Sequence, residues 1–238
     1  MFIENFRLKT AVQKLLCNVM DLVDFPLLHV RREMQRRAVH ETADYLSARA
    51  PGAVGLPTAR DVLLRALQAA RDVPGSYVEF GVYKGATLDF IARRCLQKTV
   101  WGFDSFEGLP EAWSGNPSMF DAAGKLPRVR SNAQLVRGWF DQTLPGWLAS
   151  QPAPIAFVHI DCDLYSSTKA VFDAIGPRLA PGAVIVFDEY FGYPGWQQHE
   201  FKAFQEFVAA GAVEYEYLCY ARIQCAVKIT RPPRAATA

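Results

Sequence analysis

The sequence predicts an α/β fold: a doubly wound, mostly parallel sheet of seven strands, with an antiparallel last strand and an N-terminal helical extension. Two observations carry this prediction. From Ser76 onward, short runs rich in Val, Ile and Phe alternate with stretches of helical pattern, which is the rhythm of β–α–β units. Near the C-terminus, two further runs are separated by only two residues, which is too few for a parallel crossover but sufficient for a hairpin.

The strand candidates of the parallel part are short and nearly continuous in apolar residues. They lie at 76–81, 99–104, 133–140, 155–161 and 183–190. Strands this apolar are covered on both faces, as in a parallel sheet between two layers of helices. The runs 213–220 and 223–229, joined by Ala221 and Arg222, are expected to pair antiparallel.

The chain before Ser76 has a helical pattern. Thr58 and Asp61 resemble a capping box that starts one helix,. We therefore divide the chain into a helical extension over 1–73, a main domain over 74–230 and a frayed tail over 231–238. The extension is expected to cap the site or to form the contact of a homo-oligomer, most simply a dimer.

Composition and charge restrict the class of protein. Of 238 residues, 50% are hydrophobic and 21% charged, with a net charge of +2. A chain this apolar buries a large core, which excludes overall disorder. Because basic and acidic residues nearly balance, we expect neither nucleic acid nor a membrane as a partner.

The cysteines and the N-terminus indicate the compartment. The five cysteines are an odd number without a C-x-x-C pair, which favours free thiols in a reducing environment. No leader segment and no run of about 18 apolar residues is evident, so we expect a cytoplasmic protein.

A long connection, Ser105 to Asn132, follows the second strand candidate. It is rich in Gly and Pro and carries Phe106, Trp113, Met119 and Phe120. Connections of this length are usually functional or disordered. Because four large apolar side chains are unusual in a disordered linker, we interpret this segment as a lid over a ligand.

A glycine motif, VEFGVYKGAT, ends the first strand candidate. Gly81 and Gly85 would let the backbone approach a ligand at a helix N-terminus,, although helix packing explains such glycines about as well. Glu79 suits the amino group of a ligand. Asp104 lies 23 residues after Gly81, close to the usual spacing of an acid that accepts ribose hydroxyls, although it could instead cap a helix.

A ligand with an amino acid end and a ribose end is S-adenosylmethionine. The expected cofactor-binding set also includes Thr87 and Ser105 beside these motifs, and Trp139 and Phe140, which we place at the end of the third strand candidate, flanking the adenine.

Acidic residues follow the fourth and fifth strand candidates. Asp161 and Asp163 lie in HIDCDLYSST, and Asp188 and Glu189 in VFDEYFGYPGW. Carboxylates gathered at the carboxyl edge of a sheet repel one another unless a cation or protons compensate. Oxygen ligands of this kind favour Mg²⁺, Mn²⁺ or Ca²⁺ over zinc. The alternative is that these acids cap helices or lie in solvent.

These motifs in this order resemble the macrocin O-methyltransferase family. The resemblance covers roughly residues 74–230 and rests on VEFGVYKGAT, WGFDSFEGLP, RGWFDQTLP, HIDCDLYSST and FDEY with PGW. It implies a Rossmann-like class I methyltransferase domain that uses S-adenosylmethionine. It also implies Mg²⁺ held by Asp161, Asp188 and Glu189, although the family's usual residue at the last position is Asp. The first 73 residues do not match.

The resemblance implies methyl transfer to a small hydroxylated acceptor in natural product biosynthesis. Asp161 is the expected base as well as a ligand. His159 is an alternative base, or else a hydrogen-bonded core histidine, and His199 could reach the site or lie at the surface.

Tyr190, Tyr193 and Trp196 are expected to form an acceptor wall, although plain core packing is an alternative for about half of such aromatic residues,. The acceptor could be a sugar hydroxyl or a catechol-like phenol, and a non-catalytic S-adenosylmethionine-binding protein is a third possibility.

Overall fold

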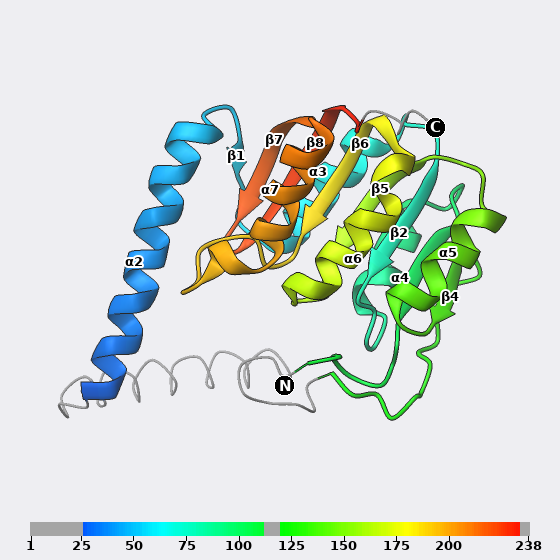
Figure 1. The fold of residues 1–238 in the computed structure, drawn as a ribbon, viewed down its shortest axis with the longest axis horizontal. Helices are drawn as coiled ribbons and strands as arrows, with labels where there is room; N and C mark the ends of the chain where they lie inside the picture. Colours follow the sequence, from blue (N-terminus) through cyan, green and yellow to red (C-terminus); the bar gives the residue numbers. More distant parts are fainter. Residues whose placement is uncertain (1–25, 112–119, 234–238) are drawn as a thin grey trace, which may run out of the picture.

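The computed structural model describes residues 26–111 and 120–233. These residues form one mixed sheet of eight strands in the order β1-β7-β8-β6-β5-β2-β3-β4 (Figure 1). All neighbouring pairs are parallel except those made by β8, which runs antiparallel to β6 and β7. The predicted doubly wound sheet with an antiparallel last strand is confirmed.

The strands lie close to the predicted runs. Their bounds are β1 Val54–Gly55, β2 Ser76–Phe80, β3 Val100–Asp104, β4 Ala133–Arg137, β5 Ile155–Ile160, β6 Leu179–Phe187, β7 Glu214–Ala221 and β8 Gln224–Arg231. β1 is the strand that the prediction of seven did not include, and its two residues are too few to produce a period. β7 and β8 form the expected hairpin, with Arg222 in a left-handed conformation (φ 54°) at its turn.

Helices cover both faces of the sheet. α3 (Ala59–Ala70) and α4 (Ala86–Arg94) pack on one face, and α5 (Phe140–Ser150), α6 (Tyr165–Ile175) and α7 (Glu200–Gly211) on the other. Two hydrophobic clusters result, one on each side, and the residues of β5 are buried throughout. This burial explains why the strand sequences are nearly continuous in apolar residues.

α3 begins as its sequence predicts. The Thr58 side chain accepts the N–H of Asp61, and the Asp61 carboxylate accepts the N–H of Thr58, which completes a capping box. Each N–H so bonded is one that the first turn of a helix leaves without an intrahelical partner. The face of α3 that follows is buried against the sheet.

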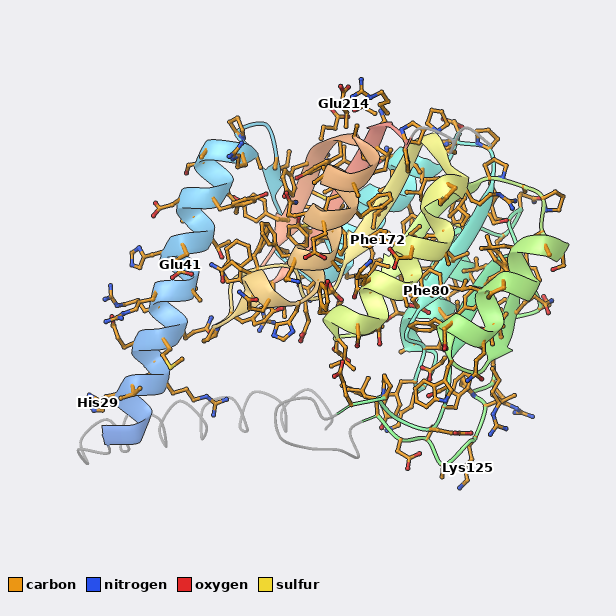
Figure 2. All side chains as sticks on the ribbon, in the orientation of Figure 1. His29, Glu41, Phe80, Lys125, Phe172 and Glu214 are labelled. Atoms are coloured by element: carbon orange, nitrogen blue, oxygen red, sulfur yellow. The ribbon has the colours of Figure 1, made fainter. Side chains whose placement is uncertain are left out.

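α2 (Pro26–Arg49) lies apart from these two layers. Figure 1 shows it beside the edge of the sheet that β1 and β7 form, and Figure 2 shows His29 at the end of the helix that extends away from the domain. Ala38 and Thr42 are its buried residues among those whose side chains are described. A helix of the predicted extension is thus observed from residue 26, whereas the bounds of the extension and its role stay predictions.

Several further predictions are tested in part. The four described cysteines are all free, and Cys17 lies outside the described residues. Trp113 and Met119 of the predicted lid also lie outside them. Over the two described ranges, no helix is both long and apolar enough to cross a membrane.

Candidate functional site

A cavity of about 730 Å³ opens at the carboxyl edge of the sheet. The segments after β2, β3 and β5 line it, together with the N-terminal ends of α4, α5 and α6. Seven of the predicted site residues lie on its wall: Gly81, Thr87, Asp104, Ser105, Trp139, Phe140 and Asp161. Its size is that of a small-molecule site, and its place is where ligands bind in doubly wound folds.

Gly81 brings the ends of β2 and β5 together. Its φ is +94°, and a Cβ built on it would lie 1.7 Å from the carbonyl oxygen of Asp161. Only glycine accommodates this contact. The N–H of Asp161 in turn donates to the carbonyl of Phe80 at 2.8 Å, so the glycine motif and Asp161 are parts of one rigid corner. Gly85 does not line the cavity; it is the N-cap of α4 (φ 75°).

Asp104 organises the turn that carries the glycine motif. Its Oδ2 accepts the N–H groups of Val82 and Tyr83, both at 2.7 Å, and its Oδ1 accepts the N–H of Phe106 at 2.6 Å. A carboxylate offers about four acceptor positions, so one remains for a ligand hydroxyl. Helix capping, the alternative weighed from the sequence, is not its role here.

Trp139 and Phe140 lie on the cavity wall but not at the end of a strand. β4 ends at Arg137, Trp139 is the N-cap of α5, and Phe140 is the first residue of that helix. The apolar run continues through the strand–helix junction, which is why the sequence pattern extended the strand too far. From the loop after β3, Phe120 contacts the Tyr83 ring edge-on with centroids 5.6 Å apart, and both line the cavity.

Glu79 and His159 form a buried pair behind the cavity. They are register partners on β2 and β5, and His159 Nδ1 lies 2.9 Å from Glu79 Oε1. Their side chains are 1% exposed and neither residue lines the cavity. The partner of Glu79 in this structure is therefore His159 and not the predicted amino group of a ligand. His159 matches the core-histidine alternative.

The charges of this pair are coupled to Asp161. Burial lowers the pKa of His159, but the hydrogen bond and charge of Glu79 outweigh it and raise that pKa to about 9. Burial raises the pKa of Glu79, and its Oε2 has no hydrogen-bond partner in the described part of the chain. Ligand atoms of Glu79, His159 and Asp161 all lie within 4.8 Å of one another.

The acids after β5 and β6 lie close enough to perturb one another. Burial and the charge of Asp188 raise the pKa of Asp161 well above its usual range. Burial, Glu189 and Asp188 raise the pKa of Asp163 to about 7, and burial and Asp188 raise that of Glu189. Asp188 accepts a hydrogen bond from Gln224 Nε2 at 3.3 Å. This donor set is made of hard oxygen atoms whose repulsion a divalent cation would relieve.

Glu200 is a site residue that the sequence did not reveal. It is completely buried, and its Oε2 accepts the N–H of Glu189 at 3.1 Å. Its Oε1 has no partner among the described residues. An acid in the first turn of a helix is ordinary in a sequence, so nothing in the pattern distinguished Glu200 from a solvated cap.

The predicted acceptor wall is mostly core. Tyr190 is 0% exposed and Trp196 2%, so the structure assigns both to packing and not to contact with an acceptor. Tyr193 is partly exposed, and its hydroxyl donates to the carbonyl of Glu189 at 3.1 Å. His199, at the start of α7, stacks on Tyr193 with ring centroids 6.1 Å apart.

Comparison with known proteins finds a matching domain and related enzymes. Residues 78–190 match the family model described as a methyltransferase domain. One curated relative is the 8-demethyl-8-(2,3-dimethoxy-alpha-L-rhamnosyl)-tetracenomycin-C 4'-O-methyltransferase of Streptomyces olivaceus, 32% identical over 146 residues. Another is the mycinamicin III 3''-O-methyltransferase of Micromonospora griseorubida, 30% identical over 154 residues. Each match covers 51% of this chain, and 55% and 58% of the relatives respectively. The chain therefore spans little more than half the length of these relatives.

Solved structures agree on the fold. The calicheamicin methyltransferase CalS11 aligns with a TM-score of 0.57 at 26% identity, covering 94% of this chain and 92% of that one. The O-methyltransferase NovP aligns with a TM-score of 0.53 at 24% identity, covering 72% of this chain and 78% of that one.

Proposed function

We propose that this chain, whose residues 78–190 match a methyltransferase domain, transfers a methyl group from S-adenosylmethionine to a hydroxyl of a sugar or a glycosylated natural product. The observation that carries the proposal is the cavity itself, because Asp161 lines the same wall as Gly81 and Asp104. A proton acceptor thus lies beside the motif expected to hold the cofactor. One relative is named for a rhamnosyl tetracenomycin compound, which supports a glycosylated acceptor, and another for mycinamicin III.

The cofactor is proposed to lie across the ends of β2 and β3. Asp104 has an acceptor position left for a ribose hydroxyl after its three backbone hydrogen bonds,. Trp139 and Phe140 offer apolar surface for the adenine,. Glu79 is not on the cavity wall, so its part is to hold His159 beneath the site.

Asp161, Asp188 and Glu189 would hold a divalent cation such as Mg²⁺. The support is electrostatic, since Asp188 raises the pKa of both other carboxyl groups by repulsion. Among the described residues, the ligand atoms that already converge within 4.8 Å belong to Glu79, His159 and Asp161, so Asp188 and Glu189 would have to move closer to Asp161 to bind one cation with it. When bound, the cation would supply charge that lowers the pKa of an acceptor hydroxyl. Glu189 reaches further than the Asp usual in the resembling family, and the fixed N–H bond to Glu200 limits how far its backbone can adjust.

The chain's own residues would perform two tasks in the reaction. Methyl transfer from a sulfonium is an in-line displacement, so alignment of acceptor and donor contributes much of the acceleration. The corner that Gly81 and Asp161 form would help to hold that alignment. A sugar hydroxyl also has to lose its proton during attack, and the Asp161 carboxylate on the cavity wall would accept it,.

The test is transfer of labelled methyl groups to two sets of acceptors, rhamnosylated natural products and catechols. Asp161→Asn keeps the shape and removes the proton acceptor, and Asp173→Asn, an exposed acid of α6, is the matched control. Transfer to glycosides that Asp161→Asn loses and Asp173→Asn retains would support the proposal. Transfer to catechols alone would replace the sugar acceptor with a phenol, and cofactor binding without transfer to either set would refute an enzymatic role.

A further inference from the structure

Gly192 is held by α2 through both of its backbone groups. It lies in the segment 190–197, between the acidic pair after β6 and the start of α7. The Thr42 hydroxyl oxygen accepts the Gly192 N–H at 2.9 Å, and Gln35 Nε2 donates to the Gly192 carbonyl at 2.5 Å. Side chains of a helix more than 140 residues away in the sequence therefore make hydrogen bonds to both backbone groups of this glycine.

The hydrogen bond between Gly192 and Thr42 is buried. Thr42 is 7% exposed, Gly192 is buried, and Ala38 is a second buried residue on the same face of α2, whereas Gln35, about one turn before Ala38, is exposed. A buried backbone N–H that loses its acceptor cannot turn to water, so the segment would have to move to satisfy it. The φ of Gly192 is +80°, and a Cβ there would lie 3.1 Å from the carbonyl oxygen of Arg222, so the segment has little room on its other side.

α2 also contacts the end of the segment directly and reaches its start through Tyr217 of β7. The Tyr45 hydroxyl lies 2.7 Å from that of Tyr217, which lies 3.0 Å from that of Tyr190. At the other end, Gln197 Nε2 donates to Glu41 Oε2 at 2.9 Å, and the rings of Tyr45 and Trp196 meet edge-on. The direct contacts of α2 with the middle and the end of this short segment therefore hold it against the helix.

The segment contains Tyr193, the one residue of the predicted acceptor wall that is not part of the core, although no residue of the segment lines the described cavity. The segment follows Glu189 directly, and Tyr193, the neighbour of Gly192, donates its hydroxyl proton to the Glu189 carbonyl. A displacement of Gly192 would therefore move Tyr193 and, through it, Glu189. The cavity wall near the expected cofactor, at Asp104 and Phe140, belongs to other elements.

We infer that Thr42 and Gln35 are positioning residues that fix the segment 190–197, so that α2 shapes the acceptor side of the site while leaving the cofactor side unchanged. The inference rests on the proposed function. It separates two roles within one chain: β2, β3 and α5 would bind the donor, and α2 together with the segment would orient the acceptor.

The experiment compares Thr42→Val, which has the same shape but no hydroxyl, with Thr42→Ser, which restores the acceptor oxygen. Gln35→Met is a second variant that removes the other hydrogen bond to Gly192. Gln35 is exposed, so this variant is informative even if Thr42→Val does not fold. Glu33→Gln, whose ion pairs stay within α2, is the control. For each protein we would measure kcat and KM for the acceptor, the Kd of S-adenosylhomocysteine, and deuterium uptake at 188–197.

Thr42→Val is expected to raise the acceptor KM roughly tenfold, the size of effect expected for a lost buried hydrogen bond. It should speed uptake at 188–197 and leave the Kd of S-adenosylhomocysteine within about twofold. Thr42→Ser should return KM close to wild type, and Gln35→Met should shift KM in the same direction as Thr42→Val.

An unchanged KM in Thr42→Val and Gln35→Met would overturn the inference, as would a loss of thermal stability without any change of KM. Wild-type turnover is measured first. Its absence would refute the proposed function, whereas normal wild-type turnover with insensitive variants would refute the inference about α2 alone.

Discussion

Asp104 Oδ2 accepts the backbone N–H of Tyr83 at 2.7 Å. The last residue of β3 thus fixes the turn after β2, where Tyr83 has a left-handed φ of 47°. Backbone strain of this kind persists only where the surroundings hold it. The acid predicted to bind a ribose is therefore also the acid that shapes the turn beside it.

Asp104→Ala should weaken binding of S-adenosylhomocysteine at least tenfold. The variant loses a charged acceptor for the ligand, worth about 1.5–3 kcal/mol for such hydrogen bonds, and releases the turn at Val82 and Tyr83 as well. Calorimetry measures the Kd, with Asp173→Ala as a control for loss of an exposed acid. An affinity within twofold of wild type would remove Asp104 from the binding site.

Gly81→Ala should destabilise the domain by about 2–6 kcal/mol. This range adds about 1–3 kcal/mol for a strained backbone to about 1–3 kcal/mol for overpacking, since the new Cβ would meet the Asp161 carbonyl at 1.7 Å. Gly146→Ala in α5 is the contrasting control, because nothing lies within 4 Å of its Cβ position and alanine favours a helix by about 0.5–1 kcal/mol. Urea unfolding of both variants checks the difference, and equal stabilities would contradict the described corner.

The sheet could be predicted because strands that are buried on both faces consist almost entirely of apolar residues. The β5 residues Ile155–Ile160 are all buried, and the run contains one polar side chain, His159. That exception was informative, since Glu79 interrupts β2 at the register partner of His159. Two polar residues at matched depth in adjacent apolar strands indicate a buried pair, a signal that the spacing of motifs alone did not supply.

Other parts of the site could not be predicted because they depend on contacts between distant segments. Tyr190 and Trp196 follow an acidic pair and look like an acceptor wall, yet α2 and α7 cover them. Glu200 is set apart only by its burial. Nothing local in the sequence indicates that Thr42 would meet Gly192, because tertiary packing brings them together.

The stability of the protein should fall as the pH rises from about 6.5 to 9 when cofactor and metal are absent. The pKa of His159 is raised to about 9 in the folded state from an ordinary value of 6.5, so folding favours the protonated ring. The stabilisation is fully present below pH 6.5 and is lost as the pH rises through 9. It amounts to about 3 kcal/mol at most.

Glu79→Gln removes the charge that raises this pKa, so it should abolish the decline and lower stability at pH 6. Urea unfolding in EDTA at several pH values measures this. His40→Gln, on the exposed side of α2, should keep the wild-type profile. A Glu79→Gln profile parallel to wild type would mean that the pair does not titrate as described.

Glu189→Asp should bind Mn²⁺, used as a spectroscopic substitute for Mg²⁺, better than Glu189→Ala. The aspartate keeps a carboxylate in the set, whereas alanine leaves Asp161 and Asp188 as the only predicted ligands. Asp188→Asn should weaken Mn²⁺ binding more than either, because its charge acts on every other acid of the cluster. Electron paramagnetic resonance titration compares them with Glu206→Gln, an exposed acid of α7. Equal Mn²⁺ affinities in all four proteins would exclude these residues as ligands.

The most direct test of the account is the rate of labelled methyl transfer from S-adenosylmethionine to a glycosylated acceptor, measured on the wild-type protein after treatment with EDTA and again after adding Mg²⁺. We predict that transfer stops in EDTA and returns with Mg²⁺, with the label on a sugar oxygen. Undiminished transfer in EDTA would contradict the metal role of Asp161, Asp188 and Glu189. An absence of transfer to any hydroxyl, by protein shown to bind the cofactor and Mg²⁺, would contradict the proposed reaction itself.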